Sequence, residues 1–128
     1  MPPRVTVVIP NWNGERFLRL CLGSLRDQSF RAFETIVVDN GSVDGSITFV
    51  KEHFPEVNVI PLGENLGIAA AFNAGIEASR TEYVVLLNND TEQDPGWLEA
   101  LVRAAADHPE SGHFASKLVD FYDRRVLD

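Results

Sequence analysis

Four short apolar runs alternate with four segments of helical periodicity, and this alternation constrains the fold more than any other feature of the sequence. Each run is rich in β-branched residues, which strands favour. The runs cover residues 5–9, 35–38, 57–60 and 83–87. Strands that are apolar on both faces and alternate with amphipathic helices predict an α/β fold of three layers, with helices on both faces of a mostly parallel sheet.

The segments between the runs place their apolar residues on one helical face. Helices are expected over residues 15–26 and 45–54, and a third helix carries Ile68, Phe72 and Ile76 on one face. Right-handed crossovers then bring the C-terminal ends of all the strands to one edge of the sheet. Ligands of such sheets bind outside that edge.

The fourth helix is expected to begin with Asp94 as its N-cap and Pro95 at its first position. Its predicted buried stripe consists of Trp97, Leu98, Leu101, Val102 and Ala105. A last extended segment is expected over residues 114–119. We expect Asp44, like Asp94, to cap a helix rather than to act in catalysis.

The length of 128 residues suits one domain, and 45% hydrophobic residues are enough for a buried core. No apolar run approaches the roughly 18 residues that span a bilayer, and the start of the chain does not resemble a signal peptide. Cys21 is the single cysteine, so an intrachain disulfide is excluded. These features predict a cytoplasmic protein, either free or peripheral at the inner face of the membrane.

The formal net charge of −8 argues against a nucleic-acid-binding protein, which usually presents a basic face. It also restricts how a phosphate-bearing ligand is held. Backbone N–H groups or a bound cation have to neutralise the phosphates, because basic side chains are in the minority.

Each predicted strand runs into a short polar cluster at its C-terminal end. The clusters are Asn11-Trp12-Asn13-Gly14, Asp39-Asn40-Gly41-Ser42, Gly63-Glu64-Asn65-Leu66-Gly67 and Asn88-Asn89-Asp90. Turn formation alone explains short polar residues beside glycines. Four such clusters at one edge, with blander turns at the other, favour a ligand-binding edge.

Two common phosphate-binding motifs, GxGxxG and the P-loop, are absent after the first strand, which disfavours an NAD-binding or NTPase domain. A receiver or flavodoxin-like domain calls for an acidic pocket or a Ser/Thr phosphate loop there, and the first cluster offers neither. The oxygens of Asn88-Asn89-Asp90 suit a hard cation, Mg²⁺ or Mn²⁺. A cation that bridges a diphosphate would offset the acidic charge.

Four ordered motifs resemble those of the inverting glycosyltransferases of family 2, which have the GT-A fold, in their rhamnosyltransferase-like branch. The motifs cover residues 7–14, 36–46, 64–75 and 83–90. Each motif alone is weak evidence, whereas the ordered set covers nearly the whole chain. The resemblance implies a Rossmann-like GT-A domain that binds a UDP- or dTDP-linked sugar.

The resemblance also implies roles for individual residues. Pro10 and Asn11 would contact the nucleoside, and Asp39 would accept the N3–H of uracil or thymine, which suits an acceptor-only carboxylate. Asp90 would bind Mg²⁺ or Mn²⁺, with Asn88 at the first position of the usual DXD motif. Further nucleotide-binding residues by the same resemblance are Asn13, Asn65, Gly67, Asn73, Asn88 and Asn89. Trp12 either stacks on the base or packs against the protein.

Family members continue into an acceptor-binding half that carries the catalytic base, so we expect the base beyond Asp128. Residues 1–128 would then be the nucleotide-sugar-binding part, truncated before that half, of a hexosyltransferase of cell-wall or polysaccharide biosynthesis. Its acceptor would be a carbohydrate or a lipid-linked molecule. The alternative is a nucleotide-binding module without catalysis. A truncated sheet edge also predicts self-association.

Overall fold

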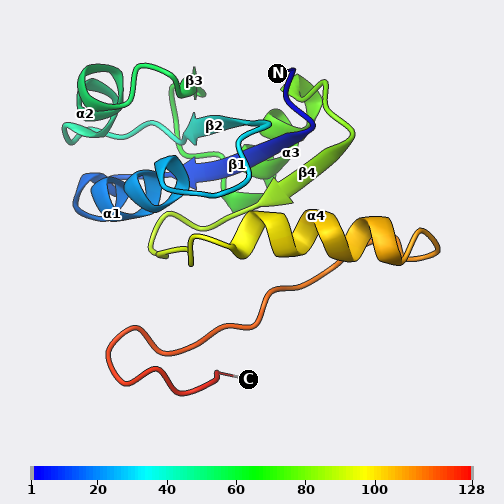
Figure 1. Ribbon diagram of the computed structural model, residues 1–128. Coiled ribbons are helices and arrows are strands. Elements are labelled where there is room, and N and C mark those ends of the chain that lie inside the picture. Colours follow the sequence, from blue (N-terminus) through cyan, green and yellow to red (C-terminus); the bar gives the residue numbers. More distant parts are fainter. Residues whose placement is uncertain (1, 128) are drawn as a thin grey trace.

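The computed structural model describes residues 2–127, which form four strands and four helices in strict alternation (Figure 1). The strands are β1 (Val5–Asn11), β2 (Phe33–Asp39), β3 (Asn58–Pro61) and β4 (Tyr83–Leu86). The helices are α1 (Glu15–Arg26), α2 (Ser46–His53), α3 (Ile68–Ala78) and α4 (Trp97–Asp107). All pairings are parallel, in the order β3-β2-β1-β4, so the predicted parallel α/β sheet is confirmed.

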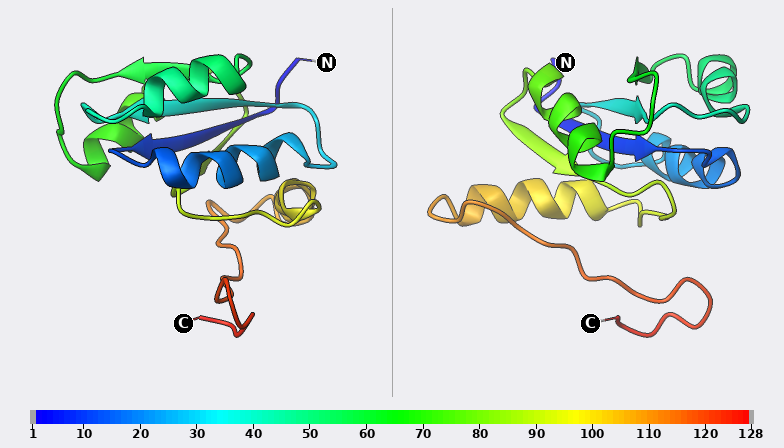
Figure 2. Two further views of the ribbon diagram at one scale, coloured as in Figure 1. Left: turned by 90° about the vertical axis from the view of Figure 1, so that its left-hand side faces the viewer. Right: turned by 180° about the vertical axis from the view of Figure 1, so that it is seen from behind.

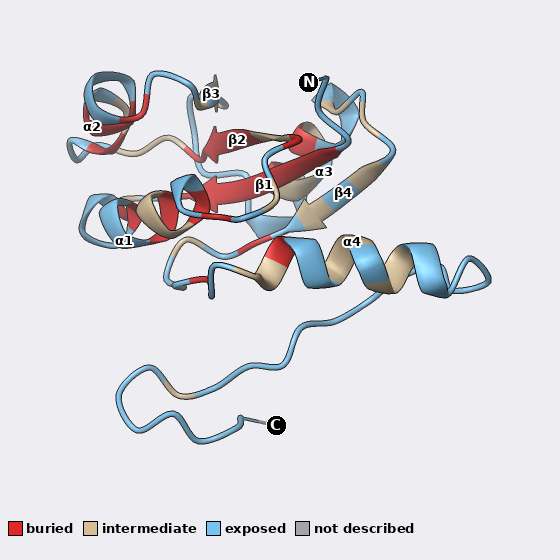
Figure 3. Cartoon of the chain, viewed as in Figure 1, coloured by how far each residue is buried: buried red, intermediate tan, exposed pale blue. Residues whose placement is uncertain are grey.

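The helices lie on both faces of the sheet, which gives the three predicted layers (Figure 2). On one face the core joins side chains of β1 and β2 to α1, α2 and Leu98 of α4. On the other face Val8, Ile36 and Val38 pack against Ala71 of α3. The buried residues therefore concentrate around β1 and β2, at the centre of the sheet (Figure 3).

The first strand is longer than expected, because it continues through Pro10 to Asn11. Pairing between β1 and β4 ends at Val8 and Leu86, whereas β1 and β2 stay paired as far as Asn11 and Asp39. The carbonyl of Val8 accepts the N–H of Leu87, so Val8 and then Pro10 turn their backbone groups toward the β4 side. No paired strand needs a donor from Pro10 there, and the proline is accommodated.

The third helix packs on a face that matches the predicted one only in part, because Phe72 is half-buried against the core. Ile68 and Ile76 are exposed, and the buried contacts come from Ala71 and Gly75. A Cβ added to Gly75 would lie 2.2 Å from Cγ1 of Val8, so the helix approaches the sheet at a distance that only small residues allow.

The fourth helix begins later than expected, at Trp97 with Gly96 as its N-cap. Asp94 forms the preceding turn, in which its carboxylate accepts the N–H of Gly96 and its carbonyl accepts that of Trp97. Of the predicted stripe, Leu98 is buried and the other members are only partly covered.

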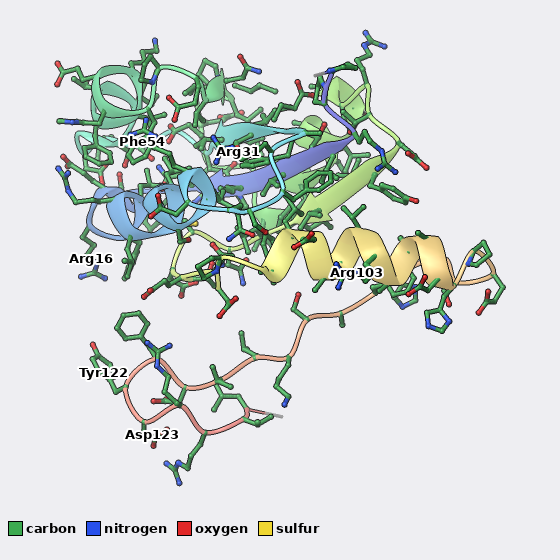
Figure 4. The ribbon with its side chains drawn as sticks, viewed as in Figure 1. Arg16, Arg31, Phe54, Arg103, Tyr122 and Asp123 are labelled. Atoms are coloured by element: carbon green, nitrogen blue, oxygen red, sulfur yellow. The ribbon has the colours of Figure 1, made fainter. Side chains whose placement is uncertain are left out.

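Residues 114–119 do not form the extended strand that the sequence predicted. Within the described chain this region has one isolated bridge, Val119 to Val126, and a hydrogen bond from Trp97 Nε1 to Ser116 Oγ. The segment lies away from the sheet, and the side chains of Tyr122 and Asp123 point away from the strands (Figure 4). None of the helices in residues 2–127 is both long and apolar enough to cross a bilayer.

Candidate functional site

The carboxyl ends of three adjacent strands are aligned at one edge of the sheet. Asn11 at the end of β1 is paired with Asp39 of β2, and Asp39 is paired in turn with Pro61 of β3. The next residues extend this alignment, because Asn40 N–H donates to the Asn11 carbonyl and Leu62 N–H donates to the Asp39 carbonyl, both at 2.8 Å. The loops after these strands therefore start side by side, as the parallel topology predicted. We call these loops, with residues 87–96 after β4, the rim.

Asp39 is only 1% exposed and is hydrogen-bonded on both carboxylate oxygens. Its Oδ1 accepts Ser42 Oγ at 2.7 Å and Asn11 Nδ2 at 3.0 Å, and its Oδ2 accepts the Ser42 N–H at 2.8 Å. A buried carboxylate needs such donors to offset the loss of hydration. The Asp39 side chain is thus held in one orientation.

Asn11 links this carboxylate to the loop after β4. Its Oδ1 accepts a hydrogen bond from Asn89 Nδ2 at 2.9 Å, while its Nδ2 donates to Asp39. Asn11 is itself 1% exposed, so its side chain is a buried connector. The predicted residues Asn11, Asp39 and Asn89 therefore form one hydrogen-bonded chain across three strands.

Asn13 braces the loops after β1 and β2 against each other. Its Oδ1 accepts the N–H groups of Val43 at 2.8 Å and Asp44 at 3.3 Å, and its own N–H donates to Ser42 Oγ. Asn13 has a positive φ of 50°, which asparagine tolerates better than most residues. Asn13, which the resemblance implied as a nucleotide-binding residue, thus holds these two loops together in the structure.

The loop before α3 is tied to the rim through Asn40, a residue for which the sequence predicted no individual role. Asn40 Nδ2 donates to the Gly67 carbonyl at 3.2 Å, and its Oδ1 accepts the Leu66 N–H at 3.3 Å. Asn65 Oδ1 accepts the Gly67 N–H at 3.0 Å, and Gly67 has a φ of 92° that favours glycine. The start of α3 is therefore held beside the end of β2.

The helices of the rim differ in how their N-terminal amides are used. In α2, Asp44 accepts the Ser46 N–H, and in α4, Gln28 Oε1 accepts the Leu98 N–H at 2.9 Å. In α1, the Glu15 N–H donates to Asp44. Among the described residues, no side chain accepts from the N–H groups of residues 68–70 at the start of α3. Of the four helices, α3 leaves its first turn of amides open to a ligand.

Asn88-Asn89-Asp90 follows β4 and meets the rim through Asn89. Thr91 Oγ1 donates to the Asn88 carbonyl at 2.8 Å, and Cys21 Sγ lies 3.8 Å from the same oxygen. Burial raises the pKa of Cys21 to about 11, so its thiol stays neutral and serves as packing beneath this loop. Asp90 is exposed.

The acidic donor set at this position is small. Within residues 2–127 no three His, Cys, Asp or Glu side chains are grouped closely enough to hold a metal ion. Mg²⁺ and Mn²⁺ commonly take one or two protein carboxylates and fill the remaining positions with water and phosphate oxygens. Asp90 together with amide oxygens fits such a site if a diphosphate supplies further ligands.

The family model for glycosyl transferase family 2 matches residues 6–126, which include all four loops of the rim. The chain belongs to glycosyltransferase family 2.

Relatives of this family 2 chain include a rhamnosyltransferase, as its motifs predicted. The chain is 34% identical over 110 residues to the putative glycosyltransferase EpsH of Bacillus subtilis, covering 84% of this chain and 32% of EpsH. It is 30% identical over 123 residues to an N-acetylglucosaminyl-diphospho-decaprenol L-rhamnosyltransferase of Mycobacterium tuberculosis, covering 88% of this chain and 39% of that enzyme. The chain thus spans between about a third and two fifths of the length of these relatives.

Solved structures confirm the GT-A-like fold of this family 2 domain. A mannosyltransferase of Pyrobaculum calidifontis, solved with GDP-Man and Mn²⁺, matches with a TM-score of 0.76 and 28% identity over 84% of this chain and 33% of that chain. Staphylococcus aureus TarS 1–349, solved with UDP, matches with a TM-score of 0.76 and 20% identity over 95% of this chain and 43% of that chain. This chain corresponds to less than half of either fold.

The remaining predicted residues of this family 2 chain make fewer contacts. Trp12 is 56% exposed, so it is not part of the core. Asn73 is exposed on α3, and Pro10 is buried in β1. A separate groove of about 960 Å³ runs between β4, α4 and residues 111–118, and Asn88 is the one predicted site residue that lines it.

Proposed function

We propose that this chain binds the nucleoside-diphosphate part of a sugar donor at the rim, within an enzyme that transfers the sugar with inversion to an acceptor hydroxyl. The observation that carries the proposal is the buried Asp39–Asn11–Asn89 chain beside the open start of α3. It joins the residue proposed for base recognition to the motif proposed for metal binding. Membership of family 2 supports the reaction class.

The nucleobase would be read by Asp39. Its Oδ1 already accepts two hydrogen bonds and its Oδ2 accepts one, which leaves acceptor capacity on Oδ2. A carboxylate with fixed orientation favours the N3–H of uracil or thymine, because cytosine has no proton at that nitrogen. Trp12, exposed beside this strand end, is suited to stack on the base.

The diphosphate would lie at the N-terminus of α3. The open amides of residues 68–70 and the positive end of the helix dipole favour an anion there. Asn65 and Gly67 shape this approach, and the positive φ of Gly67 turns the chain into the helix. Backbone amides would supply the hydrogen-bond donors and positive partial charge that the phosphates need, because the net charge of −8 leaves basic side chains in the minority.

Asp90 and the amide oxygen of Asn89 would hold Mg²⁺ or Mn²⁺ against the diphosphate. Such a cation, when bound, offsets the negative charge that develops on the departing nucleoside diphosphate. The loop's own role is to present these oxygens, and Thr91 and Cys21 fix it from below through the Asn88 carbonyl.

The rim accounts for donor binding and assigns no general base. Inverting transfer needs a carboxylate that takes the proton of the acceptor hydroxyl, held in line with the anomeric carbon. Asp123 lies on the segment that extends away from the sheet (Figure 4). The second candidate function is a nucleotide-binding module without catalysis, because donor binding at the rim by itself needs no base. Sugar transfer from UDP- or dTDP-sugars would exclude it.

Calorimetric titration with UDP, dTDP and GDP, with and without Mn²⁺, tests the donor site. We expect UDP or dTDP to bind in preference to GDP and Mn²⁺ to tighten binding by about tenfold or more. Asp90→Ala should remove the gain from Mn²⁺, whereas Asp107→Ala, at the C-terminal end of α4, should keep it. Binding that ignored both the metal and Asp90 would refute the metal role, and no nucleotide binding would refute the function.

A further inference from the structure

Asn11 stands between two groups that the proposed function assigns to different ends of the ligand. Its Nδ2 donates to Asp39 at 3.0 Å and to Ser42 Oγ at 3.3 Å, and its Oδ1 accepts from Asn89 Nδ2 at 2.9 Å. Both ends of the amide are thus used within the protein. Because its NH₂ group and its oxygen already have protein partners, the Asn11 side chain acts on its neighbours rather than on a ligand.

The direction of these hydrogen bonds follows from the chemistry of Asp39. An ionised carboxylate only accepts, so Asn11 has to present its NH₂ group to Asp39 and its oxygen to the opposite side. That oxygen only accepts as well, so Asn89 has to present its own NH₂ group to Asn11. The side-chain amide oxygen of Asn89, Oδ1, is therefore turned away from Asn11. Among the described residues this oxygen accepts no hydrogen bond.

Gly14 provides the space for this contact. A Cβ added to Gly14 would lie 2.1 Å from Asn89 Nδ2 and 2.5 Å from Asn11 Oδ1. The backbone of Gly14 has φ −105°, which other residues adopt readily. Position 14 thus requires glycine because there is no room for a side chain, and not because of its backbone conformation.

We propose that Asn11 and Gly14 are positioning residues that hold the side-chain amide oxygen of Asn89 toward the cation and diphosphate. They thereby couple base recognition at Asp39 to metal-assisted binding of the diphosphate. The inference rests on the proposed function, because the ligand at the rim is the one assigned above. It adds a role for two residues that touch no ligand atoms themselves.

Gly14→Ala tests the coupling without removing any hydrogen-bonding group. We expect this variant to lose about tenfold in UDP affinity in the presence of Mn²⁺ and much less in its absence. Gly23→Ala is the control, because Gly23 lies within α1, outside the rim, and an added Cβ meets nothing within 4 Å. Equal Mn²⁺-dependent affinities for both variants would overturn the proposal.

A measurement without ligand separates this inference from the proposed function. In NMR spectra, the Asn89 side-chain NH₂ protons should be protected from exchange in the wild type and in Gly23→Ala, and lose protection in Gly14→Ala. Protection that survives in Gly14→Ala overturns the inference even if nucleotides bind. A wild type that binds no nucleotide refutes the proposed function, while the NH₂ data still decide whether Asn11 and Gly14 orient Asn89.

Discussion

The carboxylates of Glu15 and Asp44 each accept a backbone N–H at the start of the neighbouring helix. Asp44 Oδ2 accepts the Glu15 N–H of α1, and Glu15 Oε2 accepts the Gly45 N–H that precedes α2, both at 3.2 Å. Asp44 also caps its own helix through Ser46. The two carboxylates thus join α1 to α2 and occupy helix amides that would otherwise attract a phosphate.

Asp44→Ala should destabilise the protein by about 1 kcal/mol at pH 7, because both helices lose a capping acceptor. Burial acts to raise the pKa of Asp44, but hydrogen bonds from Ser46 and Glu15 outweigh it and hold that pKa below its usual value. The stabilisation is therefore present above the pKa of the unfolded chain, about 4, and is lost as the pH falls through the lower pKa of the folded state.

Urea unfolding at pH 7 and at pH 3 measures this difference. The gap between wild type and Asp44→Ala should be smaller at pH 3. Asp107→Ala removes an acidic residue that makes no side-chain hydrogen bond in the described chain, and its effect should stay within about 0.5 kcal/mol. A gap that is the same at both pH values would contradict the assignment.

Gly75→Ala should cost about 1–3 kcal/mol, because the new methyl group overlaps Val8 and pushes α3 from the sheet. The higher helix propensity of alanine would by itself stabilise the protein by up to about 1 kcal/mol. A net loss in the free energy of unfolding would therefore show that the overlap with Val8 outweighs this gain. Gly23→Ala in α1, where an added Cβ meets nothing within 4 Å, should stabilise the protein. Thermal unfolding of the two variants tests this, and stabilisation by both would show that α3 yields easily.

Asp39→Asn should change which pyrimidine is bound. An amide at this position can donate to the unprotonated N3 of cytosine, whereas the carboxylate accepts the N3–H of uracil. We expect UDP affinity to fall by about tenfold and the ratio of CDP to UDP affinity to rise by more than that. Competition titrations with the two nucleotides measure the ratio, and an unchanged ratio would exclude Asp39 from base recognition.

The outer edge of β4 predicts self-association. In residues 2–127 this edge pairs with no further strand, and Val84 and Leu86 on β4 are 37% and 50% exposed. Sedimentation velocity should show concentration-dependent oligomers that Leu86→Lys suppresses, since lysine on an edge strand opposes pairing. Leu20→Lys, on the exposed side of α1, should leave association unchanged. A single monomeric species for the wild type would contradict this prediction.

Elements with a strong local signal could be predicted from the sequence. The helix over residues 15–26 agrees with α1, whose apolar face is buried as expected. The face of α3 was right for Phe72 but wrong for Ile68 and Ile76, because the small residues Ala71 and Gly75 make the closest approach to the sheet. The start of α4 was wrong because Asp94 caps a turn before the helix, and residues 114–119 lack a strand partner despite their apolar character.

The sequence was enough to predict that the site lies at the carboxyl edge of the sheet, but not which hydrogen bonds connect its residues. Polar clusters after parallel strands have to meet, so Asp39 and Asn11 could be placed together from topology alone. The roles of Asn40 and Gly14 depend on distances between separate loops, such as the 2.1 Å that an added Cβ would leave to Asn89. A single sequence carries no signal for such approaches beyond the residue types themselves.

Pro10 has a consequence for where the sheet can open. The crossovers from β1 to β2 and β3 run to one side, and β4 lies on the other, so the direction of winding reverses between β1 and β4. Pro10 has no N–H to donate toward β4. The pairing of β1 with β4 therefore ends at Val8 and Leu86. A missing hydrogen atom thereby helps to end the continuous sheet before Asn11 and Asn88, and leaves the loops after β1 and β4 free to carry separate polar side chains.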